Sequence, residues 1–194
     1  STDFLGLQGS IPSENGRLTA LKSLLFNDNR IIGSIPTELC GLKSVEKLFL
    51  DENNINGEIP ACLGDLSNLD ALYLHQLSIK GSIPTELCKL EKLEFLDLGL
   101  NNKMTGGIPA CLGNLKNMKR LALYGTGRTG IIPDEICRMT SLQELSLGKN
   151  DLKGPIPSCL GDLKQLRFLA AHTNGLTGSI PPELCKCTDL VALE

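Results

Sequence analysis

A four-residue motif, Gly-x-Ile-Pro, occurs eight times along the 194 residues of this chain. Eight of the ten prolines belong to it, which excludes a chance arrangement. Successive isoleucines are 24 residues apart, except for one spacing of 25; they are Ile11, Ile35, Ile59, Ile83, Ile108, Ile132, Ile156 and Ile180. A fixed period of roughly 20–29 residues rich in leucine is typical of a solenoid, in which each repeat forms one coil that stacks on the next.

The positions of one repeat, residues 48–69, each have a physical explanation. Leu48 and Leu50 alternate as in a short strand with one buried face. The side-chain amide of Asn53 can satisfy backbone groups where the chain turns inward. Pro60 cannot donate to a strand ladder and ends the extended segment. The leucines that follow it recur three residues apart, which predicts short 3-10 or helical turns on the outer side.

This pattern resembles the plant-type leucine-rich repeat, LxxLxxLxLxxNxLxGxIPxxLxxL, along essentially the whole chain. Members of that family are mostly extracellular: ectodomains of receptor-like kinases and receptor-like proteins, and polygalacturonase-inhibiting proteins. The resemblance implies an α/β-type solenoid, a right-handed curved superhelix with a parallel β-sheet on its concave face and short 3-10 or helical turns on its convex face. It also implies that the concave face recognises a ligand or a protein.

The chain departs from the family pattern at a few places. Leu77 and Thr126 replace the conserved-pattern asparagine in two repeats. The 25-residue repeat has an extra residue around 101–103, where we expect a local bulge beside the strand. We interpret residues 1–194 as a single solenoid segment of about eight 24-residue repeats. Because both ends fall inside a repeat, we expect it to be part of a longer array, without its caps.

Seven of the eight cysteines alternate between two positions, so the sequence unit is two repeats long. One set directly follows the outer core residue: Cys40, Cys88, Cys137 and Cys185. The other set directly precedes it: Cys62, Cys111 and Cys159. In a right-handed helical turn, the residue after an inward-pointing leucine faces the next coil and the residue before it faces the previous coil.

This geometry predicts the disulfides Cys40–Cys62, Cys88–Cys111 and Cys137–Cys159. Each would contribute roughly 3 kcal/mol through loop closure and would indicate an oxidising, extracellular or cell-surface location. The alternative is reduced thiols in an intracellular repeat protein. Cys185 would face a coil beyond this chain, and Cys187 replaces a core leucine and should be buried. A metal site at these last two cysteines is a further alternative, but no other ligands cluster near them, so we predict neither metal nor cofactor.

Side chains that flank the strand leucines should point out of the concave sheet into solvent. Five of the seven aromatic residues and both histidines occupy such positions. Exposed aromatics on one face are typical of a partner-binding surface, although they could also be strand formers that shield the sheet. We expect the footprint to centre on residues 49–124. The predicted partner-binding residues are Phe49, Asp51, Tyr73, His75, Phe95, Asp97, Tyr124, Phe168 and His172.

Several function classes are disfavoured. A net charge of −3 without a basic tract argues against nucleic acid, and no apolar run is long enough to span a membrane within this segment. His75 and His172 are four coils, or about 19 Å, apart, and a flat open sheet offers no enclosed pocket, so we predict no enzyme. We expect recognition of a protein, peptide or glycan. The alternative is a rigid structural component of a larger assembly or cell surface, with no small ligand.

Overall fold

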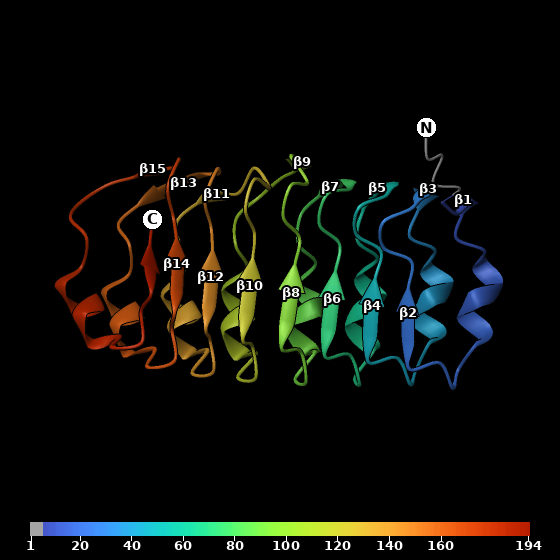
Figure 1. The fold of residues 1–194 in the computed structure, drawn as a ribbon, viewed down its shortest axis with the longest axis horizontal. Helices are drawn as coiled ribbons and strands as arrows, with labels where there is room; N and C mark the ends of the chain where they lie inside the picture. Colours follow the sequence, from blue (N-terminus) through green and yellow to red (C-terminus); the bar gives the residue numbers. More distant parts are fainter. Residues whose placement is uncertain (1–5) are drawn as a thin grey trace.

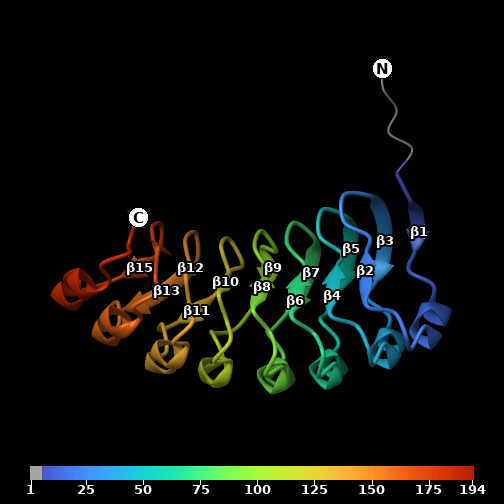
Figure 2. The same ribbon diagram turned by 60° about the horizontal axis from the view of Figure 1, so that its bottom comes forward.

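The computed structural model describes residues 6–194, whose repeats stack into one curved solenoid (Figures 1 and 2). Each complete coil contributes a strand to the concave sheet, a second short strand and a 3-10 turn. The 3-10 turns line the outer edge of the arc in Figure 2. The predicted fold class, a leucine-rich-repeat type of solenoid, is therefore confirmed.

The concave sheet has eight parallel strands, which face the reader in Figure 1. Each strand pairs with the equivalent strand of the next coil, so that Leu24 lies beside Leu48 and Leu48 beside Leu72. These central leucines are buried, and their neighbours face the concave side. The strands are β2 (Ser23–Leu25), β4 (Lys47–Phe49), β6 (Ala71–Tyr73), β8 (Phe95–Asp97), β10 (Arg120–Ala122), β12 (Glu144–Ser146), β14 (Phe168–Ala170) and β16 (Ala192–Leu193).

The second strands form two parallel ladders. One comprises β1 (Gln8–Ser10), β3 (Arg30–Ser34), β5 (Asn54–Gly57), β7 (Ser78–Gly81) and β9 (Lys103–Met104). The other comprises β11 (Thr129–Gly130), β13 (Asp151–Gly154) and β15 (Gly175–Leu176). The register offset is 22 residues between Gly57 and Ile79 but 23 between Gly81 and Met104. The extra residue of the long repeat therefore lies just before Met104, where the sequence places it, and the ladder is interrupted directly after β9.

The convex turns begin immediately after the motif prolines, whose fixed φ suits the entry to a helical turn. Their central apolar residues, such as Leu39 and Leu63, are fully buried and join the strand leucines in one continuous core. The turns are η1 (Ser13–Arg17), η2 (Thr37–Gly41), η3 (Ala61–Asp65), η4 (Thr85–Lys89), η5 (Ala110–Asn114), η6 (Asp134–Arg138), η7 (Ser158–Asp162) and η8 (Pro182–Lys186).

A column of buried asparagines closes the coils. The Asn53 side chain accepts a hydrogen bond from the backbone N–H of Ile31 (2.8 Å) and donates to the carbonyls of Phe26 (2.7 Å) and Leu50 (3.0 Å). Asn101 makes the equivalent bonds two coils further on. Buried backbone groups need such partners, so this side chain substitutes for backbone pairing at the point where each strand ends.

The two departures from this column have different consequences. Leu77 is buried and offers no hydrogen bond at its position. At Thr126, the next asparagine compensates, because the Asn150 side-chain oxygen accepts bonds from the backbone N–H groups of both Thr126 (3.0 Å) and Arg128 (2.9 Å). Arg128 occupies a core position and is fully buried. Its guanidinium donates only to the Thr126 carbonyl, and burial lowers the pKa of Arg128 to about 10.

The structure forms three disulfides between convex turns, and they are the pairs that the sequence analysis predicts: Cys40–Cys62, Cys88–Cys111 and Cys137–Cys159. Cys187 is buried as expected, and Cys185 is exposed; both are free thiols. The disulfides join η2 to η3, η4 to η5 and η6 to η7.

The junctions without a disulfide use glycine instead. A Cβ atom at Gly64 would collide with the backbone oxygen of Glu86, so the turns η3 and η4 approach more closely than any other residue would allow. Equivalent glycines lie at the other three such junctions: Gly16, Gly113 and Gly161. The two-repeat unit of the cysteines is therefore an alternation of glycine contacts and disulfides.

The first prediction concerns the disulfide between the first two bridged turns. We expect the double substitution Cys40→Ser/Cys62→Ser to lower the free energy of unfolding by about 3 kcal/mol, because the unfolded chain regains the entropy of a 22-residue loop. Urea unfolding followed by circular dichroism measures the change. Cys185→Ser, which removes a free exposed thiol, is the control and should leave the transition unmoved. Equal transitions for the double variant and the control would contradict the prediction.

The second prediction concerns Arg128, which forms no ion pair with any residue in the described part of the chain. We expect Arg128→Met to stabilise the protein by roughly 1–3 kcal/mol, because it removes a buried charge whose Nη1 atom has no hydrogen-bond partner. Thermal unfolding at neutral pH measures the change. The exposed Arg138→Met variant is the control, since its charge is already solvated. A lower melting temperature for Arg128→Met would show that its bonds to Thr126 outweigh the cost of burial.

Candidate functional site

The parallel register aligns equivalent residues of successive coils into rows across the concave face. One row consists of Phe49, Tyr73, Asp97, Ala122 and Ser146. A second row, two residues further along each coil, consists of Asp51, His75, Gly99 and Tyr124. Because sequence neighbours in a row are one repeat apart, side chains about 24 residues apart in the chain meet in space.

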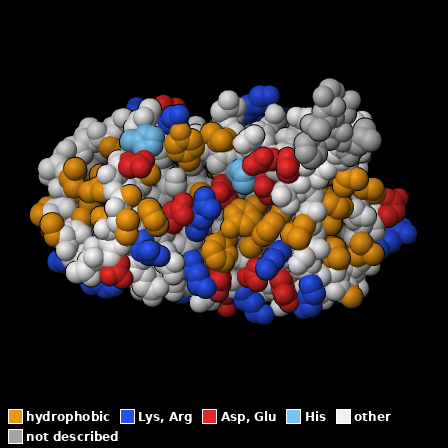
Figure 3. Space-filling model, in the orientation of Figure 1, with side chains coloured by type: hydrophobic (Ala, Val, Ile, Leu, Met, Phe, Trp, Pro, Cys, Tyr) orange, Lys and Arg blue, Asp and Glu red, His pale blue; other side chains and the backbone are white. Residues whose placement is uncertain are grey.

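These rows enclose a groove of about 590 Å³ in the middle of the concave face. Gly99 and Ala122 contribute little or no side chain, whereas Tyr73, His75 and Tyr124 are large, and this difference hollows the surface. The same face in Figure 3 shows apolar side chains gathered over the central strands, with charged side chains around them. The expectation of a flat sheet is therefore wrong.

The groove unites most of the predicted partner-binding residues but not all. Six of the nine line it: Phe49, Asp51, Tyr73, His75, Asp97 and Tyr124. Phe168 lines a smaller hollow of about 290 Å³ near the last strands. The His172 ring packs against Tyr124 with 5.9 Å between centroids, outside the groove lining. Phe95 lies outside it too, with the Lys119 ammonium 5.9 Å from its ring centre.

The sequence analysis is wrong about the exposure of these side chains. Asp51 and Asp97 are buried, with 8% and 6% of their surface exposed. Four aromatic residues are half-buried, and only Phe168 is exposed. The cause is contact between coils: the rings of Phe49 and Tyr73 pack edge to face with centroids 4.5 Å apart, for example. Strand alternation predicts the face on which a side chain lies, but not how far its row neighbours cover it.

A charge cluster surrounds His75 at one side of the groove. The His75 Nε2 atom lies 3.7 Å from an Asp51 carboxylate oxygen and 3.5 Å from Glu52 Oε1. Its Nδ1 atom lies 3.8 Å from Asp97 Oδ2. Arg120 in turn pairs with Asp97 at 3.3 Å and with Glu144 at 3.2 Å. Burial raises the pKa of the Asp51 carboxyl, and the neighbouring His75 partly offsets that shift.

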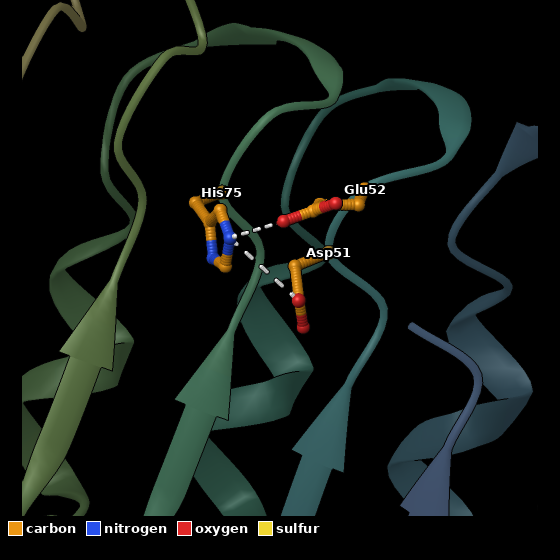
Figure 4. A group of neighbouring side chains, drawn as sticks. All are labelled: Asp51, Glu52 and His75. Atoms are coloured by element: carbon orange, nitrogen blue, oxygen red, sulfur yellow. Dashed lines mark ion pairs between the residues drawn. The ribbon is translucent and has the colours of Figure 1, made fainter. Parts of the chain in front are cut away.

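Two members of this cluster, Glu52 and Arg120, are absent from the predicted site residues, as is any metal ligand. The structure nevertheless brings one ligand atom each of Asp51, Glu52 and His75 within 4.8 Å of one another (Figure 4). The signal was present in the repeat, since residues one coil apart become neighbours. The prediction weighted aromatic residues instead and did not compare acids and histidines across coils.

Comparisons with known proteins agree with the repeat. The family model for Leucine Rich Repeat matches residues 20–42, 44–66 and 141–163. The solved plant peptide hormone receptor RGFR1, in complex with RGF2, is 34% identical with a TM-score of 0.93, over 95% of this chain and 30% of that chain. The ectodomain of the Arabidopsis receptor kinase HAESA, in complex with an IDA peptide hormone, is 32% identical with a TM-score of 0.92, over 95% and 31%.

A plant ice-binding protein is 28% identical with a TM-score of 0.80, over 93% of this chain and 66% of that chain. A comparison with curated proteins gives no match. The chain is a leucine-rich-repeat protein. It closely resembles the ectodomains of plant receptor kinases and spans about a third of the length of the two receptor chains described above. Ectodomain-like solenoids of this kind are typically non-catalytic, and no helix within residues 6–194 could cross a membrane.

The third prediction concerns the ion pairs of Arg120. We expect Arg120→Met to destabilise the protein by about 1 kcal/mol, because the buried Asp97 loses its strongest cationic partner while solvent screens the partly exposed guanidinium. Urea unfolding measures the change. Lys119→Met is a matched control on the neighbouring residue, since the Lys119–Glu94 pair is partly exposed at both ends and should contribute less. An equal loss in both variants would show that the burial of Asp97 does not matter.

Proposed function

We propose that this chain is an extracellular recognition module that binds a peptide, or an extended segment of a protein, in the concave groove between Phe49 and Tyr124. The observation that supports this most directly is the groove itself, because half-buried aromatic rings and charged groups stand together on rigid strands. Aromatic anchors in a preformed hollow are where binding energy concentrates in protein interfaces.

The dimensions of the groove suit an extended chain. It crosses the strands from β4 to β12, which are four strand spacings, or about 19 Å. An extended peptide advances about 3.3 Å per residue, so about six residues fit along it. The two solved receptors that resemble this chain most closely in the comparisons above are both in complex with peptide hormones, by their printed descriptions. That likeness supports a peptide rather than a glycan.

The proposed location depends on the disulfides. Three cross-links between coils persist in an oxidising environment and would be reduced in a cytosol. The same cross-links also support the alternative function, a rigid structural component without a small ligand. The two functions differ in one respect: only a recognition module needs the side chains that line the groove.

The fourth prediction tests the groove as a binding site. We expect the immobilised protein to select peptides from a phage-displayed library of random heptapeptides. Isothermal titration should then show that Tyr73→Ala and Tyr124→Ala each weaken binding of the selected peptides at least about 30-fold, which is the loss expected of an anchor worth about 2 kcal/mol. Phe168→Ala is the matched control, since it removes a concave-face aromatic outside the groove.

Two outcomes would contradict the proposal. Selected peptides that bind Tyr73→Ala and Tyr124→Ala as tightly as the unaltered protein would place the site elsewhere on the solenoid. A library that yields no peptide competing for the groove would favour the structural alternative.

A further inference from the structure

Three potential metal ligands converge where two neighbouring concave strands end. Asp51 and Glu52 follow β4, and His75 follows β6 in the next coil (Figure 4). The His75 Nε2 atom lies 3.7 Å from Asp51 Oδ2 and 3.5 Å from Glu52 Oε1, so one imidazole nitrogen faces two carboxylates.

These separations are too long for hydrogen bonds, which join such nitrogen and oxygen atoms at roughly 2.7–3.2 Å. They match the distance between two ligands of one ion instead. Tetrahedral Zn²⁺ holds nitrogen and oxygen ligands at about 2.0–2.2 Å, which places neighbouring ligand atoms about 3.4 Å apart. The three side chains therefore surround a space of the right size for a single ion.

Asp51 provides an independent indication of a missing partner. The residue is more than nine-tenths buried, and its Oδ1 atom has no hydrogen-bond partner in the structure. Its Oδ2 atom faces His75. A buried carboxylate is costly unless a cation or hydrogen-bond donors compensate it, and an ion between Asp51 and His75 would do so.

Asp97 completes the arrangement from behind the imidazole. Its Oδ2 atom lies 3.8 Å from the His75 Nδ1 atom, on the ring side opposite the two ligand carboxylates. Asp97 is itself held by the backbone N–H of Gly99 at 3.0 Å and by Arg120 at 3.3 Å. Metal-binding histidines usually direct their second ring nitrogen to a carboxylate, which fixes the tautomer and strengthens the ligand. Asp97 is thus a positioning residue and not a ligand.

We propose that Asp51, Glu52 and His75 bind a divalent transition-metal ion, with Zn²⁺ as the occupant that one imidazole and two carboxylates suit best. Three protein ligands leave a coordination position open toward the groove, for water or for a donor atom of a partner. The inference does not depend on peptide binding, because the ligands and their spacing belong to this chain alone.

The repeat offers a matched control for the key ligand. His172 occupies the position of His75 four coils further along, but the residues in the preceding coil are Gly148 and Lys149 instead of Asp51 and Glu52. The acid near it is Glu194, at 3.7 Å. A metal site that arises from the combination of ligands should exist at His75 and not at His172.

The fifth prediction is a Zn²⁺ titration of the folded, EDTA-treated and dialysed protein by isothermal titration calorimetry at neutral pH. The protein contains Cys185→Ser, because the free exposed thiol could bind zinc by itself. We expect one Zn²⁺ per chain with a Kd in the micromolar range. His75→Gln and Glu52→Gln should each weaken binding at least 100-fold, and His172→Gln should leave it unchanged. Asp97→Asn should weaken it about 10-fold, as loss of an outer carboxylate does at metal sites.

The ligand set also has a spectroscopic readout. Co²⁺ bound at the site should give a visible absorption band that Zn²⁺ abolishes and that His75→Gln lacks. Circular dichroism verifies that each variant is folded, and His75 is half-exposed, so its replacement should not disturb the core. Absence of Zn²⁺ binding below millimolar concentrations would overturn the proposal, and so would unchanged binding by the folded His75→Gln variant. Either result would leave the four observed ion pairs as a simple charge cluster.

Discussion

The hydrogen bonds of one buried side chain make the rest of this solenoid possible. Each concave strand must end in a turn inside the protein, and the asparagine there joins backbone groups of its own coil to those of the coil before it. These bonds fix the stacking register, and the register aligns equivalent residues into rows. The groove and the charge cluster are products of that alignment. Where the asparagine is replaced at Thr126, Asn150 takes over its bonds, which shows how little freedom the backbone has there.

Most of the architecture could be predicted because it repeats. The period gives the coil length, the leucines give the buried face, and the phase of Cys40 against Cys62 gives the direction of a disulfide. Features that occur once were missed. The burial of Arg128 follows from its place in a core column that the sequence fills with apolar residues elsewhere, but charge alone suggested a surface residue. The close contact at Gly64 depends on a neighbouring backbone and has no local signal.

The candidate site was predictable in outline only. The strand pattern identifies the concave positions, and six of the nine predicted residues line the groove. Coverage of Asp51 and Asp97 depends on which side chains stand beside them in adjacent coils, and alternation within one strand contains no such information. The groove owes its depth to two small residues, Gly99 and Ala122, which are easily overlooked in a search for large or charged ones. Comparison across coils would have found Glu52 beside His75.

The alternation of cross-links at the convex turns has a mechanical consequence. When the two ends of a chain are pulled apart, tension passes through each disulfide and spares the residues between the bridged cysteines. Residues 41–61, which include Phe49, Asp51 and Glu52, would keep their length, whereas residues 63–87, which include Tyr73 and His75, would extend first. Stretching would therefore separate neighbouring rows of the groove before it unravels either disulfide loop, and binding at this face would report the force on the solenoid.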